Sequence, residues 1–160
     1  MQLIAVDLIR QRATCKDCGH KFATYAFPDF EYGRKEAETQ NPSDFAFVDC
    51  LSDPVCKEVS SLVKEVLSGL GKKDWQVARC FDQVFGVACD PAPSGHQYDF
   101  TGKVWCPVCG STNTDYGPEV PMQVETVHIP HVTHRAWQQL KEMEKRELIR
   151  ETLQKVGCLL

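Results

Sequence analysis

The chain has 160 residues, of which 42% are hydrophobic and 25% are charged, and its formal net charge is −4. This composition fits one globular domain that buries its own core and excludes a long low-complexity tract, while the acidic balance argues against a phosphate backbone as the main partner. Asp7 and Arg10 interrupt the apolar start of the chain, so we expect neither a signal-peptide core nor a membrane span there.

The first third of the chain predicts short strands joined by a polar loop. Residues 2–13 alternate between apolar and polar side chains, which is typical of a strand, and residues 22–27 predict a second strand. Residues 28–44 are rich in proline, glycine, asparagine and charge, and they predict a loop whose carboxylates are solvated. A further short strand is expected over residues 45–48.

Two helices follow, each with recognisable end signals. Asp53 precedes Pro54 and an apolar stripe, so we expect Asp53 to cap a helix that begins at Pro54. Asp74 is expected to cap the second helix, and Gly86 is expected to end it. The apolar face of this second helix is Val77, Ala78, Phe81, Val84 and Phe85.

The last third predicts strands and then a long helix. Residues 98–105 surround Thr101-Gly102 and predict a hairpin, residues 120–129 predict a strand, and residues 133–156 predict a helix capped by Thr133. The two halves of this helix carry apolar faces roughly 150° apart, since each residue turns the helix by about 100°. Either one half contacts something outside the domain, or the helix wraps between two parts of its own domain.

Paired cysteines occur twice at the spacing of metal-binding knuckles. Zinc prefers four thiolate or imidazole ligands in a tetrahedron, and a CxxC turn presents two sulfurs to one ion. A glycine follows each pair, Gly19 and Gly110, which allows a tight turn that directs backbone amides at the sulfurs. The four cysteines are Cys15, Cys18, Cys106 and Cys109.

Through these two knuckles and their flanking strands the sequence resembles the zinc-ribbon family. The resemblance implies a three-stranded ribbon with all four cysteines bound to one structural Zn²⁺. The chain differs from a simple ribbon because residues 19–105 separate the pairs. Closing so long a loop costs about 4–5 kcal/mol, against ~10–16 kcal/mol of apparent binding energy for structural zinc. The insert therefore does not exclude the site.

These elements together predict an α+β fold: a split zinc ribbon, which is a small antiparallel sheet, with a two-helix insert and a long C-terminal helix. We expect a single domain over residues 1–160. The ribbon sheet is expected over residues 1–27 and 98–132, the helical insert over residues 45–90, and the C-terminal helix over residues 133–156.

Two other roles for the cysteine pairs were weighed. Residues 105–109 also fit a dithiol redox site, but such a site needs a helix after the first cysteine, and residues 110–118 form a turn-rich sequence. A structural disulfide is the other alternative. The odd number of nine cysteines, with four in knuckles, favours a reducing compartment, and we expect a cytoplasmic protein.

The five remaining cysteines give weaker signals. Four of them, Cys50, Cys56, Cys80 and Cys89, have spacings unlike a knuckle, so a second all-thiolate site is not favoured. Buried free cysteines usually behave as small hydrophobes, which is the reading preferred for Cys56 and Cys80. Cys158 lies near the end of the chain and is expected to be a free thiol.

Three histidines form the other cluster that suggests a metal. His128, His131 and His134 lie three residues apart, and on an extended chain such residues point to opposite sides, so a common site needs a turn at Pro130. A catalytic metal would also need a general base, for which Glu125 is available. The simpler reading is a set of exposed polar residues between a strand and a helix.

The sequence predicts a non-enzymatic, zinc-stabilised module that binds another protein, regulatory or toxin-neutralising in the manner of immunity proteins. No small-molecule substrate and no membrane partner are evident. The first alternative is a nucleic-acid-binding zinc ribbon, with Trp75, Tyr98 and Trp105 near lysines as stacking residues. The second alternative is a metal-dependent enzyme that uses the three histidines.

Overall fold

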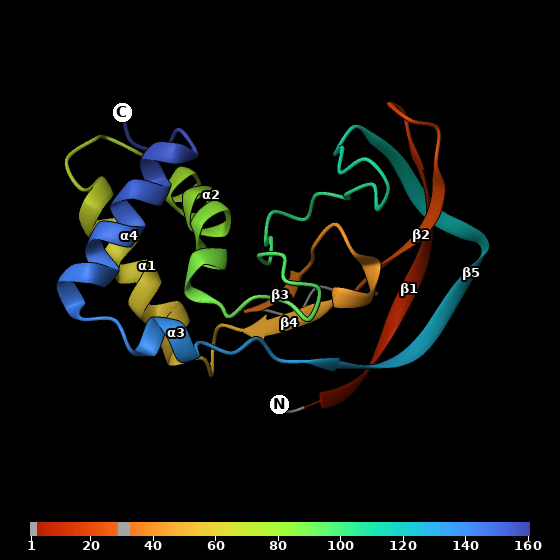
Figure 1. The fold of residues 1–160 in the computed structure, drawn as a ribbon, viewed down its shortest axis with the longest axis horizontal. Coiled ribbons are helices and arrows are strands. Elements are labelled where there is room, and N and C mark those ends of the chain that lie inside the picture. The colour runs from red at the N-terminus through yellow and green to blue at the C-terminus, as the bar shows by residue number, and fades with distance from the viewer. Residues whose placement is uncertain (1–2, 29–32) are drawn as a thin grey trace.

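A computed structural model describes residues 3–28 and 33–160 of the chain. The fold is α+β with small antiparallel sheets, which confirms the predicted class. Figure 1 shows the helices gathered at one end of the molecule and the larger sheet at the other. The strands are β1 (Leu3–Cys15), β2 (Lys21–Ala26), β3 (Arg34–Ala37), β4 (Ala46–Asp49) and β5 (Thr114–Pro130). The helices are α1 (Pro54–Leu67), α2 (Asp74–Val84), α3 (Arg135–Gln138) and α4 (Glu142–Lys155), with 3₁₀ turns at Pro42–Asp44 and Phe85–Ala88.

The larger sheet has the strand order β2-β1-β5, and all its pairs are antiparallel. The strands predicted over residues 2–13 and 22–27 are confirmed within the described residues, and β5 begins earlier than the predicted residues 120–129. The register between β1 and β5 shifts where Arg10 pairs with Gln123 and Gln11 pairs with Pro118. Residues 119–122 therefore have no partner on β1 and form a bulge.

The smaller sheet, β3 with β4, lies between the two ends of the molecule (Figure 1). A loop was predicted over residues 28–44, and this was wrong for Arg34–Ala37, which pair with Asp49–Ala46. Residues 29–32 of that loop lie outside the described residues. A four-residue strand has too few side chains to show alternation, so only its pairing with β4 identifies it.

The hairpin predicted over residues 98–105 does not form. Asp99 makes a single bridge to Glu38 instead, through hydrogen bonds of 3.0 and 2.7 Å between their backbones. The Asp99 carboxylate accepts bonds from the amide and hydroxyl of Thr101 and from the indole of Trp105. These local bonds fold the segment as a side-chain-stabilised turn, which competes with strand pairing.

Helix α1 begins at the predicted residue, whereas α2 begins one residue earlier than predicted. Asp53 accepts a hydrogen bond of 2.8 Å from the amide of Val55, so the predicted cap of α1 is confirmed. Asp74 is the first residue of α2 rather than its cap. Gly86 does not end the helical segment, which continues beyond α2 as the 3₁₀ turn Phe85–Ala88. A side chain at position 86 would place its Cβ atom against the carbonyl oxygen of Tyr98, so the position requires glycine.

The helix predicted over residues 133–156 is broken into α3 and α4. The amide of Lys141 donates to the Glu144 carboxylate at 2.9 Å and so starts a new helix. Trp137 before the break and Ile149 and Leu153 after it are all buried in the same core. Both halves thus pack in one core of the protein itself, and the break, rather than one helix between two parts, brings the two apolar faces to it.

The predicted cap, Thr133, does not cap the start of α3. A residue of a distant loop, Asp90, does so instead. Asp90 accepts hydrogen bonds from the amides of Arg135 and Ala136 at 2.9 and 3.1 Å, and from the hydroxyl of Thr133 at 2.6 Å. Burial alone would raise the pKa of Asp90, but these donors hold it below its ordinary value. The cap therefore ties the last third of the chain to the segment after α2.

Two disulfides lie at the helical end, Cys50–Cys56 and Cys80–Cys158. The prediction of a free thiol at Cys158 was wrong, because this residue is buried beside α2. Disulfides persist in oxidising compartments, so these four paired cysteines do not support the expected reducing compartment. None of the described helices is long and apolar enough to cross a membrane.

Candidate metal centre

The two knuckles meet at the end of the larger sheet. The Sγ atoms of Cys15, Cys18, Cys106 and Cys109 all lie within 4.8 Å of one another. Across the knuckles, Cys15 and Cys109 are 3.5 Å apart and Cys18 and Cys106 are 3.6 Å apart. In a tetrahedron with metal–sulfur bonds of about 2.3 Å the sulfurs would be ~3.8 Å apart. The four sulfurs are therefore placed to hold one metal ion.

Both knuckles have the same backbone turn. The amide of Gly19 donates to the carbonyl of Cys15 at 2.8 Å, and that of Gly110 donates to the carbonyl of Cys106 at 2.9 Å. The two glycines have φ angles of 79° and 74°, in the left-handed region that favours glycine. In each knuckle the first cysteine is buried and the second is exposed. The glycine after each cysteine pair is thus required by the left-handed backbone conformation at that position.

Backbone amides also favour the charged form of a sulfur. Desolvation would raise the pKa of the Cys106 thiol, but the amides of Cys109 and Val108 donate to it and lower this pKa to about 7. A thiolate is the form that binds metal, so this turn prepares Cys106 as a ligand. For Cys109 the amide of Ser111 acts in the same direction, but the sulfur of Cys15 and burial raise its pKa to about 12.

A polar bridge that the sequence did not indicate joins the knuckles. Asp17, inside the first knuckle, accepts hydrogen bonds from the hydroxyl of Ser111 and from the side-chain amide of Asn113. These bonds hold the pKa of Asp17 below its ordinary value. The amide of Lys16 also donates to the carbonyl of Asn113 at 2.8 Å. The knuckles are therefore held together by hydrogen bonds of the protein itself, in addition to any metal ion that their four sulfurs bind.

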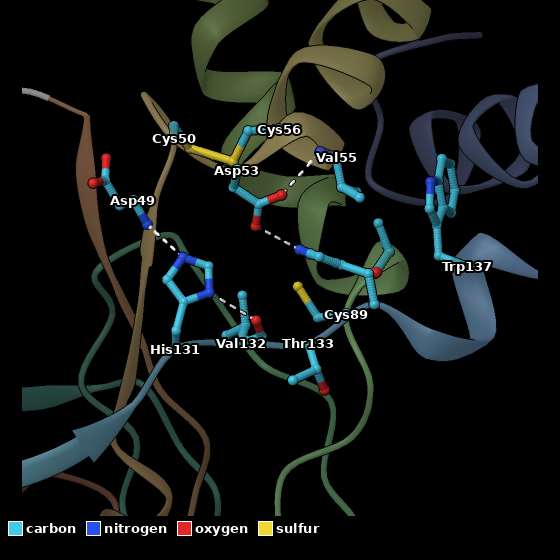
Figure 2. A network of polar contacts seen from close by, with 12 residues as sticks. Asp49, Cys50, Asp53, Val55, Cys56, Cys89, His131, Val132, Thr133 and Trp137 are labelled. Atoms are coloured by element: carbon cyan, nitrogen blue, oxygen red, sulfur yellow. Dashed lines mark hydrogen bonds and ion pairs between the residues drawn. A yellow bond between two sulfur atoms is a disulfide. The ribbon is translucent and has the colours of Figure 1, made fainter. Parts of the chain in front are cut away.

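The three histidines do not form a second group of this kind. In the described part of the chain, the cysteines are the one set of three or more potential ligands close enough to share an ion. His131 accepts a bond from the amide of Asp49 at Nε2, 3.0 Å away, and Nδ1 lies 2.8 Å from the carbonyl of Val132 (Figure 2). Both ring nitrogens are thus occupied, while His128 is exposed on β5.

His134 has a different role, as half of a buried ion pair. Its Nε2 lies 2.6 Å from the Asp53 carboxylate and its Nδ1 lies 2.6 Å from the carbonyl of Ala88. Burial would lower the pKa of His134, but both acceptors raise it above its ordinary value. Burial would likewise raise the pKa of Asp53, but His134 and the amide of Val55 lower it. Figure 2 shows Asp53 between the Cys50–Cys56 disulfide and the strand-to-helix segment.

The remaining cysteines do not build a second thiolate site. Cys50, Cys56 and Cys80 are in disulfides, which leaves Cys89 as a free thiol. Burial first, and then the charges of Asp53 and Asp90, raise the pKa of Cys89 well above its ordinary value. Cys89 is therefore an unreactive thiol.

The structure gives little support to a dithiol redox site or to a nucleic-acid-binding surface. Cys106 and Cys109 are not followed by a helix, because the chain passes from the knuckle into β5, so a helix-activated dithiol is not built. Of the aromatic residues considered for stacking on bases, Tyr98 is buried and Trp105 is bonded to Asp99, whereas Trp75 is exposed. These three side chains do not form one stacking surface.

Comparison of the chain with protein-family models, with curated proteins and with solved structures gives no match. The cysteine group therefore stands on the chain's own geometry, as a metal-binding module within an α+β fold.

Proposed function

We propose that the chain is a non-enzymatic protein-interaction module whose sheet end is held by one structural Zn²⁺ on Cys15, Cys18, Cys106 and Cys109. The observation that carries this proposal is the set of four sulfurs within 4.8 Å of one another. Four thiolates complete a tetrahedral site and leave no open position for a substrate, which is the pattern of structural rather than catalytic zinc.

The donor set favours zinc over most other metals. Thiolates are soft ligands, and a tetrahedral four-sulfur site selects zinc or iron rather than magnesium or calcium. The split ribbon is the natural frame for such a site, because β1 enters the first knuckle and β5 begins just after the second. A metal ion held by both knuckles would then link the end of β1 to the start of β5.

A contact surface for a protein partner is available on the bulge of β5. Val120 and Met122 in the bulge are 92% and 60% exposed, and Val124, on the paired strand just after it, is 55% exposed. An ion pair of 3.3 Å between Arg10 and Glu119 holds the base of the bulge against β1. Apolar side chains gathered on an exposed surface are typical of protein-binding sites. The net charge of −4 favours a partner with a basic surface, as for a regulatory or toxin-neutralising protein.

Metal analysis tests the first half of the proposal. Protein purified without added metal should contain one zinc ion per chain, and replacing both Cys15 and Cys106 by serine should abolish it. Iron in place of zinc would appear as visible charge-transfer absorption and would contradict the assignment. A second metal that survives these replacements but is lost in the H128A/H131A/H134A variant would contradict the non-enzymatic reading.

Affinity purification tests the second half. Tagged wild-type protein should retain a partner at stoichiometric level in mild salt, and the V120E/M122E variant should lose it. M143E is the matched control, because Met143 is 84% exposed but lies on α4 at the other end of the molecule. Loss in both variants, or the absence of any stoichiometric partner in native lysate, would contradict a contact surface on the bulge.

A further inference from the structure

A groove at the helical end lies between α1, α2 and the β3–β4 hairpin. None of its lining residues belongs to the group of four cysteines. The groove encloses about 830 Å³. Volumes of roughly 300–1,000 Å³ are typical of small-molecule sites in proteins. The accessible part of its apolar lining is Leu51, Val77 and Ala78, while Val63, Phe81 and Cys56, which also line it, are buried in the core. The groove therefore offers an apolar surface large enough for one small organic molecule.

Polar side chains of α1 follow one edge of this groove. Lys57, Ser60, Ser61 and Lys64 all line it, and their spacing of three, four and seven residues places them on one face of the helix. The buried residues of α1, such as Val59 and Val63, lie on the neighbouring face. The helix thus presents two ammonium groups and two hydroxyls beside the apolar lining.

The hairpin supplies a cation of the opposite edge. Lys35 of β3 is ion-paired with Asp82 of α2 at 2.8 Å, whereas the guanidinium of the neighbouring Arg34 lies over the rings of Phe27 and Phe47. The ammonium of Lys35 also lies 6.0 Å from the centre of the Phe81 ring. With Asp74 as the other acidic residue, and without Arg34, the lining has three basic and two acidic side chains, a balance of +1. The molecule as a whole carries −4, so the groove is a local positive region on an acidic protein.

We propose that this groove binds a small organic anion with an apolar body. The lysines of α1 would hold the anionic head, and the surface formed by Leu51, Val77 and Ala78 would cover the apolar part. This combination of an apolar surface with a few placed charges is how ligand sites fix the orientation of a ligand. The inference does not depend on the zinc ion or on the β5 bulge, since no residue is shared with either.

Isothermal titration of the full chain with dodecanoate, below its micelle concentration, tests the proposal. We expect one dodecanoate per chain, binding at least ten-fold tighter than dodecylammonium, which has the same apolar chain and the opposite charge. Butanoate should bind at least ten-fold more weakly than dodecanoate, because it cannot cover the apolar lining. These comparisons use only the wild-type protein, so they do not depend on whether a variant folds.

A pair of double variants locates the site. K57Q/K64Q should weaken dodecanoate binding at least five-fold, whereas K103Q/K155Q should change it less than two-fold, because these two exposed lysines do not line the groove. Equal weakening in both double variants would overturn the proposal. So would equal binding of dodecylammonium, equal binding of butanoate, or tighter binding of a ten-residue peptide of alternating glutamate and leucine.

Discussion

The helical end and the sheet end of the molecule are stabilised in different ways. At the helical end, 22 described residues form one buried apolar cluster, contributed by α1, α2, α3, α4 and the β3–β4 hairpin. At the sheet end, the described cluster contains only Val6, Leu8, Phe47 and Ile129. The helical end also has both disulfides, and the sheet end has the four free cysteines of the knuckles.

This difference explains where cross-links are needed. The three-stranded sheet contributes three of these buried side chains, Val6, Leu8 and Ile129, and gains less from apolar burial than the helical end, at about 1.5–3 kcal/mol for each large side chain. Small domains with too little core commonly depend on a metal or a disulfide. We therefore expect the sheet end to depend on its metal and the helical end to depend on packing, on its ion pair and on its disulfides.

Removing a metal ligand should have the largest effect and should be confined to one end. In Cys15→Ser we expect loss of the bound metal and of hydrogen-exchange protection in β1, β2 and β5, since metal binding supplies on the order of 10 kcal/mol. Protection in the helices should remain. Cys89→Ser, at a free cysteine outside the knuckles, is the control and should keep both. Equal loss of protection in the helices would show that the two ends do not unfold separately.

Breaking the buried ion pair should have the largest effect at the helical end. Asp53→Asn leaves His134 without its charged partner, and such losses cost about 3–5 kcal/mol. Denaturant unfolding measures this cost, with Asp115→Asn on exposed β5 backbone as the control.

The same pair gives a pH dependence with a defined sign. The pKa of Asp53 is below its ordinary value of 3.8 and that of His134 is above its ordinary value of 6.5. The contribution of the pair is therefore complete between these two values. It is lost as pH falls through the lowered pKa of Asp53 and as pH rises through the raised pKa of His134. A stability difference between wild type and Asp53→Asn that stays constant from pH 3 to pH 9 would contradict this account.

The two disulfides should contribute unequally. Cys80–Cys158 links residues 78 apart and Cys50–Cys56 links residues six apart. On a chain-entropy model, opening the longer loop costs about 4 kcal/mol and the shorter about 2 kcal/mol. Thermal unfolding of Cys158→Ser and Cys50→Ser, each compared with wild type in the absence of reductant, measures the ratio. A larger loss in Cys50→Ser would mean that loop length does not govern these cross-links.

A further pH-dependent effect is expected between the two ends, where Glu36 of β3 and Glu38, just after this strand, are neighbouring carboxylates. Burial, and then the charge of Glu36, raise the pKa of Glu38 to about 8. Since this folded-state pKa lies above the ordinary 4.5, stability falls as pH rises from 4.5 through 8. Glu38→Gln should thus stabilise the protein at pH 8 and leave it nearly unchanged at pH 4, which denaturant unfolding at the two pH values measures. Glu151→Gln, at an exposed position of α4, should have no such pH-dependent effect.

Local patterns predicted the features that local interactions build. Asp53 followed by Pro54 and an apolar stripe fixed the start of α1, because a cap and a first-turn proline act within a few residues. The knuckles were predictable for the same reason, since spacing and one glycine define each turn. That the two knuckles meet followed from their shared chemistry rather than from any pattern between them.

Features that depend on distant segments were not predictable. Cys80 and Cys158 are brought together by the packing of the chain end on α2, and nothing in their spacing indicates this. The break before α4 depends on Lys141 and Glu144, a capping pair without the usual serine or threonine. The groove is assembled from three elements, so the sequence indicated no small-molecule site.

The bulge of β5 has a consequence for how this chain tolerates change in length. One end of the β1–β5 ladder is fixed by the knuckles, where Cys15 pairs with Thr114, and the other continues into His131, which is bonded to Asp49. Moving either paired stretch by one residue would turn Ile129 or its neighbours to the wrong face. Residues 119–122 have no partner on β1. An insertion or deletion at this site should leave the fold intact even where it disturbs the contact surface, because the bulge can change length without moving either anchored end.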